Sequence, residues 1–387
     1  MKYRLVGLTA VFGGMALALP LGAAPPAPLP PPELDVIPVA VLFDVGSGQQ
    51  LYAKNQKLRF LPASVTKVMT AYLAFELLAQ GKLSPQQRYT VNSKTYRQWQ
   101  GQGTTMNLLE GESVSVDALL QGLTTVSAND AAIVLAEGFA GDVPRWCQLM
   151  NAEARRLGMH DSHFATPNGW PDEGATYVSA NDLVKLGEAL VVRHPDLYRR
   201  YFGKKRMTWN DFSAVNHDPN IGAVEGADGI KTGYTREAGY NYLGSAERGG
   251  RRLLMVLAKA PSGRERKLAS RALIEWGFTA WTARPLFALG AKVGEARVQG
   301  GDAREIALTA PYSIHSVASR GAKPALALRI VYQGPIAAPI AKGARIAELE
   351  IAAEGQVTRR VPLFAASAVG KAGPLDRLVN GFMGFWA

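Results

Sequence analysis

Alternating and helical patterns of apolar residues divide most of the chain into short predicted elements. Residues 39–52 alternate on either side of a Gly-rich turn, which predicts a β-hairpin. The residues after Ser64 favour a helix that begins at Ser64 and ends at Gly81. The same reasoning predicts helices at 113–139 (broken at 125–129), 143–157, 179–192 and 262–276, strands at 226–233, 240–247 and 251–259, and a Pro- and Gly-rich loop at 167–174.

The pattern changes after about residue 284, where short apolar runs alternate with Gly-rich turns. We expect a small β domain at 285–370, preceded by a larger domain of helices and strands at 36–284. A chain of 387 residues is long for a single domain, which favours this division. The clearest strand-like runs of the β domain are 326–332, 345–351 and 357–364.

The N-terminus has the form of a secretory signal peptide, which we assign to residues 1–24. A basic start, an apolar run from Leu5 to Leu19 and small residues around Ala24 are typical of such a segment. The alternative is a membrane-spanning helix, but the run is short for that purpose and Pro20 ends it. The proline-rich residues 25–35 predict an extended leader.

The C-terminus, residues 371–387, predicts an amphipathic helix. Its apolar side chains recur at helical spacing, while Asp376, Arg377 and Asn380 fall on the other side. A helix with Trp and Phe on one face favours a peripheral membrane anchor. The alternative is a terminal helix that docks on the protein's own core. The apolar positions are Leu375, Leu378, Val379, Phe382, Met383, Phe385 and Trp386.

Composition excludes some classes of protein and adds one expectation. The formal net charge of +11 favours an anionic lipid or polymer as partner. Nucleic acid is not expected, because neither zinc-finger spacing nor a basic stretch with interleaved aromatic residues is present. Cys147 is the only cysteine, so no intrachain disulfide is possible, and it reads as a buried packing residue. His160 and His163 are the only close histidine pair and have no Glu between them, so a metal hydrolase is the weakest interpretation, and we expect no metal and no cofactor.

Three short motifs stand in order along the chain: Ser64–Lys67, Ser127–Asn129 and Lys231–Gly233. Each has an ordinary interpretation when taken singly. The serines and Asn129 could cap helices, and Lys231 could be a solvated strand residue. A Ser-x-x-Lys pair alone also arises readily by chance, so only the combination carries information.

Together the motifs describe an activated serine. Lys67 lies one helical turn after Ser64, so both side chains face the same way. A lysine acts as a base only when it is neutral, and burial, a helix N-terminus and a second cation at Lys231 all disfavour its charged form. The backbone N–H of Ser64 could stabilise an oxyanion at the start of the helix.

The other two motifs supply groups that suit a peptide substrate. Ser127 could pass a proton to the leaving amine, and Asn129 could hold a substrate amide. Lys231 and Thr232 could bind a carboxylate. Gly233 would let the strand backbone approach the ligand closely.

The chain resembles the low-molecular-mass penicillin-binding proteins that are D-alanyl-D-alanine carboxypeptidases of the peptidase S11 family. These proteins share the Ser-x-x-Lys and Lys-Thr-Gly signatures with class A β-lactamases. The resemblance implies an α+β fold, a serine β-lactamase-like domain whose antiparallel sheet is flanked by helices, followed by a small all-β C-terminal domain. It rests on these stretches: PASVTKVMTAYLAFE, TTVSANDAAIVLAE, FATPNGWPDEGATYVSANDL, GADGIKTGYTREAGYNYLGSAERGGRRLLMVL and SRALIEWGF.

The resemblance also implies roles for single residues. It makes Ser64 the acylated serine and Lys67 the base, with a carboxylate-binding arginine upstream of the Trp-Gly-Phe sequence. Arg266 suits that arginine best, and Arg264 is the second choice. The remaining motif residues carried over are Ser127, Asn129, Lys231, Thr232 and Gly233. Two departures stand out, Ala128 where many relatives have Asp or Gly, and Tyr234 where some have His.

The implied activity is removal of the terminal D-Ala from the peptidoglycan stem peptide, with covalent binding of β-lactam antibiotics. With its signal peptide and anchor, the enzyme is expected on the periplasmic face of the bacterial inner membrane. A DD-endopeptidase acting on cross-linked peptides remains an alternative. A β-lactamase is less favoured because Tyr177, not Asn, follows Glu173 by four residues. A non-catalytic wall-binding module would not need three intact motifs.

Overall fold

A computed structural model describes residues 28–322, 324–353 and 358–373. The predicted signal peptide and most of the proline-rich leader lie outside the described residues, as does the C-terminal segment from residue 374. Contacts group the chain into two compact units, one of residues 30–45 and 50–278 and one that includes residues 46–49 and those from 279 onward. Within the described ranges, no helix combines the length and the apolar character needed to cross a membrane.

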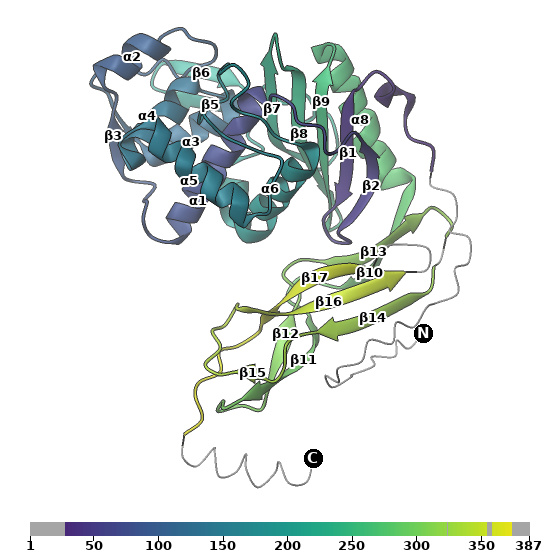
Figure 1. Ribbon diagram of the computed structural model, residues 1–387. Coiled ribbons are helices and arrows are strands. Elements are labelled where there is room, and N and C mark those ends of the chain that lie inside the picture. Colours follow the sequence, from purple (N-terminus) through teal and green to yellow (C-terminus); the bar gives the residue numbers. More distant parts are fainter. Residues whose placement is uncertain (1–27, 323, 354–357, 374–387) are drawn as a thin grey trace, which may run out of the picture. The chain divides into compact units, whose positions relative to one another are not determined.

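A five-stranded antiparallel sheet forms the framework of the first unit, in the order β2-β1-β9-β8-β7 (Figure 1). The hairpin predicted at 39–52 and the three later strands are all present. Because β7 is the last strand in this order, one side of its backbone pairs with no further strand of the sheet. The strands are β1 Val39–Asp44, β2 Gln49–Lys54, β7 Ala227–Thr235, β8 Gly239–Arg248 and β9 Arg251–Ala260.

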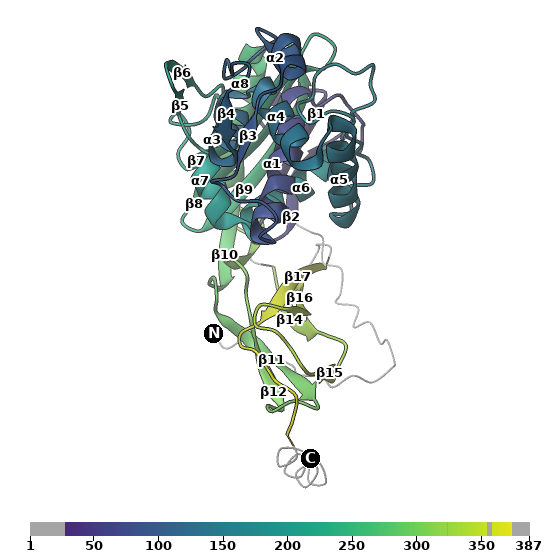
Figure 2. The same cartoon turned by 90° about the vertical axis from the view of Figure 1, so that its left-hand side faces the viewer.

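Helices cover both faces of this sheet, with α8 on one face and the remaining large helices on the other (Figures 1 and 2). The arrangement confirms the predicted α+β class. The helices are α1 Lys67–Ala79, α2 Ser93–Trp99, α3 Val116–Gln121, α4 Asn129–Ala140, α5 Val143–Arg156, α6 Ala180–Arg193, α7 Pro195–Tyr201 and α8 Gly263–Thr279.

Two glycines show how closely helices approach the two faces. A Cβ on Gly277 of α8 would lie 2.7 Å from Leu253 of β9, and a Cβ on Gly187 of α6 would lie 3.3 Å from Leu254. Successive residues of a strand point to opposite faces. Leu253 and Leu254 are both fully buried, so β9 is covered on both sides.

Helix α1 runs through the core between the sheet and the outer helices. Every residue from Lys67 to Leu77 is buried, which is the pattern of a helix surrounded on all sides. Its two charged residues therefore both have partners. Glu76 accepts hydrogen bonds from Arg193 and from Tyr72, which stabilise its carboxylate. Lys67, at the other end, lies in the site described below.

Several short elements differ from the sequence predictions. The helix predicted from Ser64 begins at Lys67, because Ser64 lies in a 3-10 turn, η2 Ala63–Thr66. The break predicted near 125–129 is a π-helical turn, η3 Gly122–Val126. The first turn and the two-stranded sheets that were not predicted are η1 Pro32–Leu34, β3 Arg88–Thr90 with β4 Ser113–Ser115, and β5 Arg206–Trp209 with β6 Phe212–Val215.

The second unit is built from strands, as its sequence predicts. A six-stranded sheet has the order β14-β16-β17-β12-β11-β15, and β10 pairs with β13. Its buried residues form a separate hydrophobic core that includes Leu308, Leu349 and Leu363. The strands are β10 Trp281–Phe287, β11 Lys292–Gln299, β12 Glu305–Thr309, β13 Ile314–Ser319, β14 Leu326–Val331, β15 Ile336–Ala337, β16 Arg345–Ala353 and β17 Arg359–Ala365.

The described residues also bear on the predictions for the C-terminal helix and for Cys147. The first residues of the predicted C-terminal helix are extended, since Lys371 forms an isolated bridge with Gly301. Cys147 on α5 is buried, and burial raises the pKa of its thiol to about 12. A thiol with so high a pKa is a poor nucleophile at neutral pH, which agrees with a packing role.

Candidate active site

The three motifs meet around the start of α1. Ser64 lies in the 3-10 turn η2, and Lys67 is the first residue of the helix that follows. The residue before the serine, Ala63, has a φ of 48°, a left-handed conformation that is unusual for a residue with a side chain. Such strain at a turn occurs where the surrounding structure fixes the backbone.

Lys67 has three oxygen neighbours, and its Nζ lies within hydrogen-bond distance of each. The distances are 2.8 Å to Ser64 Oγ, 2.8 Å to Asn129 Oδ1 and 2.7 Å to the backbone oxygen of Asn168. The two carbonyl oxygens only accept hydrogen bonds. A neutral amine has two N–H groups and one lone pair. Donating to both carbonyls therefore leaves its lone pair for the hydroxyl of Ser64.

The surroundings of Lys67 favour this neutral form. Burial lowers the pKa of Lys67 well below its usual value, and the nearby charge of Lys231 lowers it further, whereas Asp130 opposes the shift. Only 1% of Lys67 is exposed, so water does not compensate a positive charge there. The pair of Ser64 and Lys67 can thus act as a nucleophile with an adjacent base.

The second motif is held by the link between η3 and α4. Ser127 ends the π turn in the left-handed conformation, with a φ of 67°, and is buried. Its hydroxyl makes no hydrogen bond to Ser64 or Lys67 within the described part of the chain. Asn129 is fixed more firmly, because its Nδ2 donates to the backbone oxygen of Gln102 at 2.9 Å and its backbone N–H donates to Thr104 O at 2.7 Å.

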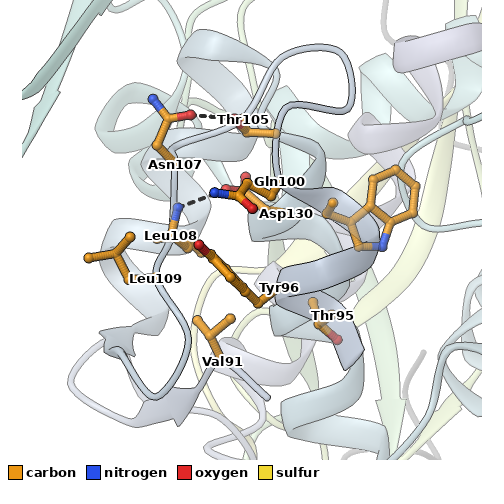
Figure 3. Close-up of a pocket in the computed structure, with 10 residues that line it drawn as sticks. Val91, Thr95, Tyr96, Gln100, Thr105, Asn107, Leu108, Leu109 and Asp130 are labelled. Atoms are coloured by element: carbon orange, nitrogen blue, oxygen red, sulfur yellow. Dashed lines mark hydrogen bonds between the residues drawn. The ribbon is translucent and has the colours of Figure 1, made fainter. Parts of the chain in front are cut away.

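Asp130 fixes the loop that holds Asn129. Its buried carboxylate accepts hydrogen bonds from the backbone N–H groups of Met106, at 3.0 Å, and Leu108, at 3.2 Å. A cavity of about 200 Å³ is lined by Asp130, by Tyr96 of α2 and by Leu109 (Figure 3). None of the three motifs lines this cavity, so we assign it no part in the chemistry.

The third motif brings strand β7 against the turn that carries the nucleophile. A Cβ added to Gly233 would lie 2.5 Å from the backbone oxygen of Pro62 and 3.1 Å from the backbone nitrogen of Ser64. No side chain fits at that position. The close approach at Gly233 is therefore between the protein's own strand and turn, and the predicted approach of the strand to a ligand stays a prediction.

Lys231 is the second buried cation of the site. Its Nζ donates to the backbone oxygen of Thr232 at 2.8 Å. Burial and the neighbouring Arg266 lower its pKa to about 7, although Asp218 opposes the shift. Lys231 and Arg266 thus form a region of positive potential that suits a carboxylate ligand.

Arg266 rather than Arg264 belongs to this region. Arg264 is exposed, whereas Arg266 is partly buried on α8 and its guanidinium carbon lies 5.6 Å from the centre of the Tyr240 ring. One of its nitrogens, Nη1, donates to Asn241 O at 3.3 Å, while its buried Nε has no hydrogen-bond partner among the described residues. An arginine with unused donors is suited to binding an anion.

Sequence reasoning missed three neighbours of the motifs. Asn168 contributes a backbone oxygen, which any residue would supply, so no side-chain pattern reveals it. Asp218 and His217 lie in the segment before β7, and the pKa of His217 is lowered by burial, Lys231 and Arg266. A His-Asp pair close to a motif in sequence would have been a weak signal.

Two known protein families match the sequence of this chain. Residues 32–262 match the peptidase S11 family, described as D-alanyl-D-alanine carboxypeptidase. The chain belongs to this family of serine peptidases. Residues 281–371 match the C-terminal domain of penicillin-binding protein 5. The two matches together cover both compact units and confirm the resemblance drawn from the motifs.

Individual known proteins are similar to this chain along most of its length. The D-alanyl-D-alanine carboxypeptidase DacD of Salmonella typhimurium is 32% identical over 358 residues, which is 91% of each protein. Penicillin-binding protein 5 of Haemophilus influenzae has a similar structure, with a TM-score of 0.69 at 30% identity over 87% of this chain and 98% of that one. Penicillin-binding protein D2 of Listeria monocytogenes, solved in its ampicillin-bound form, has a TM-score of 0.55 at 28% identity, over 63% of this chain and 98% of that one.

Two residues depart from those that many relatives have in the motifs, Ala128 and Tyr234. Of these, Tyr234 changes the exposed surface. It directly follows the Lys-Thr-Gly motif and is 53% exposed, and its ring stacks on Tyr240 with the ring centres 4.2 Å apart. Ala128 is fully buried and changes little.

Proposed function

We propose that this chain is a D-Ala-D-Ala carboxypeptidase that removes the terminal D-Ala from peptidoglycan stem peptides through an acyl-enzyme on Ser64. The observation that carries the proposal is the position of Lys67 Nζ. This amine lies 2.8 Å from Ser64 Oγ and is buried between two carbonyl oxygens that use its donors. It can therefore take the hydroxyl proton as a neutral base.

The reaction then has two steps. Ser64 Oγ attacks the carbonyl carbon of the penultimate D-Ala as its proton passes to Lys67. The backbone N–H of Ser64 stabilises the oxyanion. When the peptide C–N bond breaks, the leaving amine takes up a proton, for which Ser127 is the proposed relay. In the second step water hydrolyses the ester and regenerates Ser64, so that the products are the shortened peptide and free D-Ala.

The first experiment is labelling with penicillin, which resembles an acyl-D-Ala-D-Ala end. We expect the purified protein to gain the full mass of the antibiotic on the peptide that contains Ser64. The ampicillin-bound relative supports this expectation. Ser64→Ala should take up no label, while Ser84→Ala, which changes an exposed serine, should react like the parent protein. Labelling of Ser64→Ala would refute the assignment of the nucleophile.

The second experiment separates the carboxypeptidase from the endopeptidase. Thr232, Lys231 and Arg266 are the proposed partners of the terminal carboxylate. A peptide that ends in D-Ala-D-Ala should be cut, and its C-terminal amide should react about tenfold to a hundredfold more slowly, because a hydrogen bond to a charged group contributes about 1.5–3 kcal/mol. Equal rates on the acid and the amide would favour an endopeptidase, whose substrate continues beyond the cut.

We also propose that the enzyme is exported and held at the periplasmic face of the inner membrane. The support comes from the sequence alone, from the signal-peptide pattern of residues 1–24 and the apolar face of residues 371–387. A peripheral anchor would keep the active enzyme close to the site of wall assembly.

A further inference from the structure

A cluster of two tyrosines and one arginine lies beside the proposed carboxylate site. Tyr234 on β7 and Tyr240 on β8 are directly opposite each other in the two strands, and their rings stack with the centres 4.2 Å apart. The guanidinium carbon of Arg266 lies over the Tyr240 ring, 5.6 Å from its centre. Tyr240 therefore contacts both the exposed tyrosine of the edge strand and the arginine of α8.

The alternation of side chains along β7 places this cluster on the face of the sheet that α8 covers. A Cβ on Gly233 would point at the turn η2 that carries the nucleophile. Its neighbours Thr232 and Tyr234 therefore point to the opposite face, because successive side chains of a strand alternate. Gly263, the first residue of α8, agrees with this placement, since a Cβ there would lie 3.3 Å from the Tyr240 ring.

The surroundings of Arg266 differ from those of a second arginine that also lies over a tyrosine ring. Arg252 lies over Tyr198, and its guanidinium pairs with Asp228 at 2.7 Å. Arg266, by contrast, forms no ion pair within the described part of the chain. Its Nη1 donates one long hydrogen bond, of 3.3 Å, to a backbone oxygen, and its Nε has no partner among the same residues.

This difference indicates what the Tyr240 ring does. A carboxylate partner would occupy the N–H groups of the guanidinium, whereas the face of a tyrosine attracts the positive charge and leaves those donors free. The ring can therefore fix the position of Arg266 without using its hydrogen-bond donors. A carboxylate usually binds arginine through two parallel N–H groups, so a guanidinium held in this way suits the terminal carboxylate of the substrate.

We propose that Tyr240 is a positioning residue for Arg266 and that Tyr234 supports it by stacking on its ring. The inference rests on the proposed carboxypeptidase function and adds to it the residues that set its preference for a free terminal carboxylate. Tyr240 acts through the guanidinium, and Tyr234 acts through Tyr240, so neither needs to contact the substrate. Because the ring face carries the effect, phenylalanine at position 240 should serve as well as tyrosine.

The test uses the full-length protein and an N-acylated peptide that ends in D-Ala-D-Ala, as the free acid and as the C-terminal amide. Tyr240→Leu keeps an apolar side chain but removes the ring. We expect its kcat/KM on the acid to fall about two- to thirtyfold, the range for a cation–π contact. Its kcat/KM on the amide should equal that of the parent, since the amide has no charge for Arg266 to bind. Tyr240→Phe should keep the parent's preference for the acid.

Further variants separate positioning from folding. Tyr234→Leu should reduce the preference for the acid less than Tyr240→Leu does, because it removes only the stacked ring. Tyr52→Leu is the matched control, since this tyrosine of β2 contacts Trp276 of α8, with ring centres 6.3 Å apart, at the other edge of the same sheet. It should leave the preference unchanged. In an Arg266→Gln protein, Tyr240→Leu should not change the ratio of the two rates further.

An equal loss of kcat/KM on the acid and the amide in Tyr240→Leu would overturn the inference, because the ring would then support the site in general. A Tyr240→Phe protein that behaves like Tyr240→Leu would also overturn it. Tyr234 is exposed, so its variant tests the inference even where Tyr240→Leu does not fold, and an unchanged preference would contradict it. These outcomes leave the carboxypeptidase function standing. If the parent cuts the acid and the amide at the same rate, the proposed function itself fails.

Discussion

The two buried lysines of the site differ in their hydrogen-bond partners. Each has one nearby cation and one nearby carboxylate, which are Lys231 and Asp130 for Lys67 and Arg266 and Asp218 for Lys231. Lys67 also has two carbonyl oxygens that use its donors. These surroundings suit Lys67 to work as a neutral base and Lys231 to work as a cation that binds a carboxylate.

This difference predicts how activity depends on pH. Since the pKa of Lys231 is about 7, this residue loses its proton as the pH rises through that value. A bound carboxylate favours the protonated form, so binding should weaken on the alkaline side. We expect kcat/KM for a D-Ala-D-Ala peptide to fall above about pH 7 and the fall to disappear in Lys231→Arg, because arginine stays protonated.

The matched change at the other lysine should behave differently. Lys67→Arg keeps the positive charge but cannot become neutral, so we expect no acylation by penicillin at any pH, although the protein folds. A penicillin reaction of Lys67→Arg as fast as that of the parent would exclude Lys67 as the base. If kcat/KM of Lys231→Arg still falls above about pH 7, a group other than Lys231 causes that fall.

Three backbone segments determine the position of the nucleophile. The turn η2 lies against Gly233 of β7 and against the loop that follows Asn168. A Cβ on Gly169 would lie 1.9 Å from the backbone oxygen of Ala63. No real Cβ approaches an oxygen so closely, so a side chain at Gly169 would push the loop away from the serine.

Substitution of two glycines in the same loop tests this arrangement. Gly169 and Gly174 both have positive φ, but a Cβ on Gly174 would meet no atom within 4 Å. Alanine should cost about 1–2 kcal/mol of strain at either position. At Gly169 it should cost a further 1–3 kcal/mol, roughly, for overpacking, and slow penicillin acylation by up to about a hundredfold. Urea unfolding and acylation rates measure the two effects.

Gly174→Ala serves as the control for the backbone strain. It should lose stability but keep its acylation rate, since a Cβ on Gly174 would meet no atom within 4 Å. If both variants lose acylation equally, loop conformation in general would explain the loss, and the contact between Gly169 and Ala63 would have no special part.

The sequence predicted the elements whose apolar residues repeat over a long stretch. Helices α5, α6 and α8 and strands β7 to β9 agree with the predicted ranges to within a few residues. Short elements such as α2, α7 and the β5–β6 hairpin were missed. They span only four to seven residues each, too few to show a period, and their place depends on tertiary contacts.

The candidate site also has features that the sequence predicts and features that it does not. Its side chains were predicted, because serine, lysine and asparagine at fixed spacing carry a chemical meaning. Most of its backbone geometry was not, because the left-handed conformations of Ala63 and Ser127 and the carbonyl of Asn168 depend on how segments pack. The hydrogen bond that Lys67 Nζ donates to Asn129 Oδ1 also joins two motifs that are 62 residues apart, which sequence spacing does not reveal.

At the scale of the whole molecule, the second unit has the features of a domain that folds by itself. It has its own hydrophobic core and its own six-stranded sheet. From residue 286 onward the sequence contains 12 Lys and Arg and 7 Asp and Glu, a net charge of 12 − 7 = +5. A positive net charge favours a surface with anionic headgroups and supports the proposed membrane anchor.

Truncation after Pro374 tests the proposed anchor. We expect the shortened protein to leave the membrane fraction and remain in the periplasm, with its penicillin labelling unchanged, because the apolar positions of the tail are gone. The full-length protein serves as the control. A shortened protein that stays with the membrane would place the anchor elsewhere. Loss of labelling would show that the tail supports the fold.

The carbonyl oxygen that Asn168 provides to Lys67 has a consequence for how the enzyme can vary. Every amino acid carries this oxygen, so no single substitution at position 168 can delete it. The partner on the other side, the Asn129 amide, is lost with one change of codon. Selection against the base, for example by an antibiotic, can thus remove the Asn129 amide by a single substitution. Removing the carbonyl oxygen of residue 168 from Lys67 instead requires a change in the path of the loop.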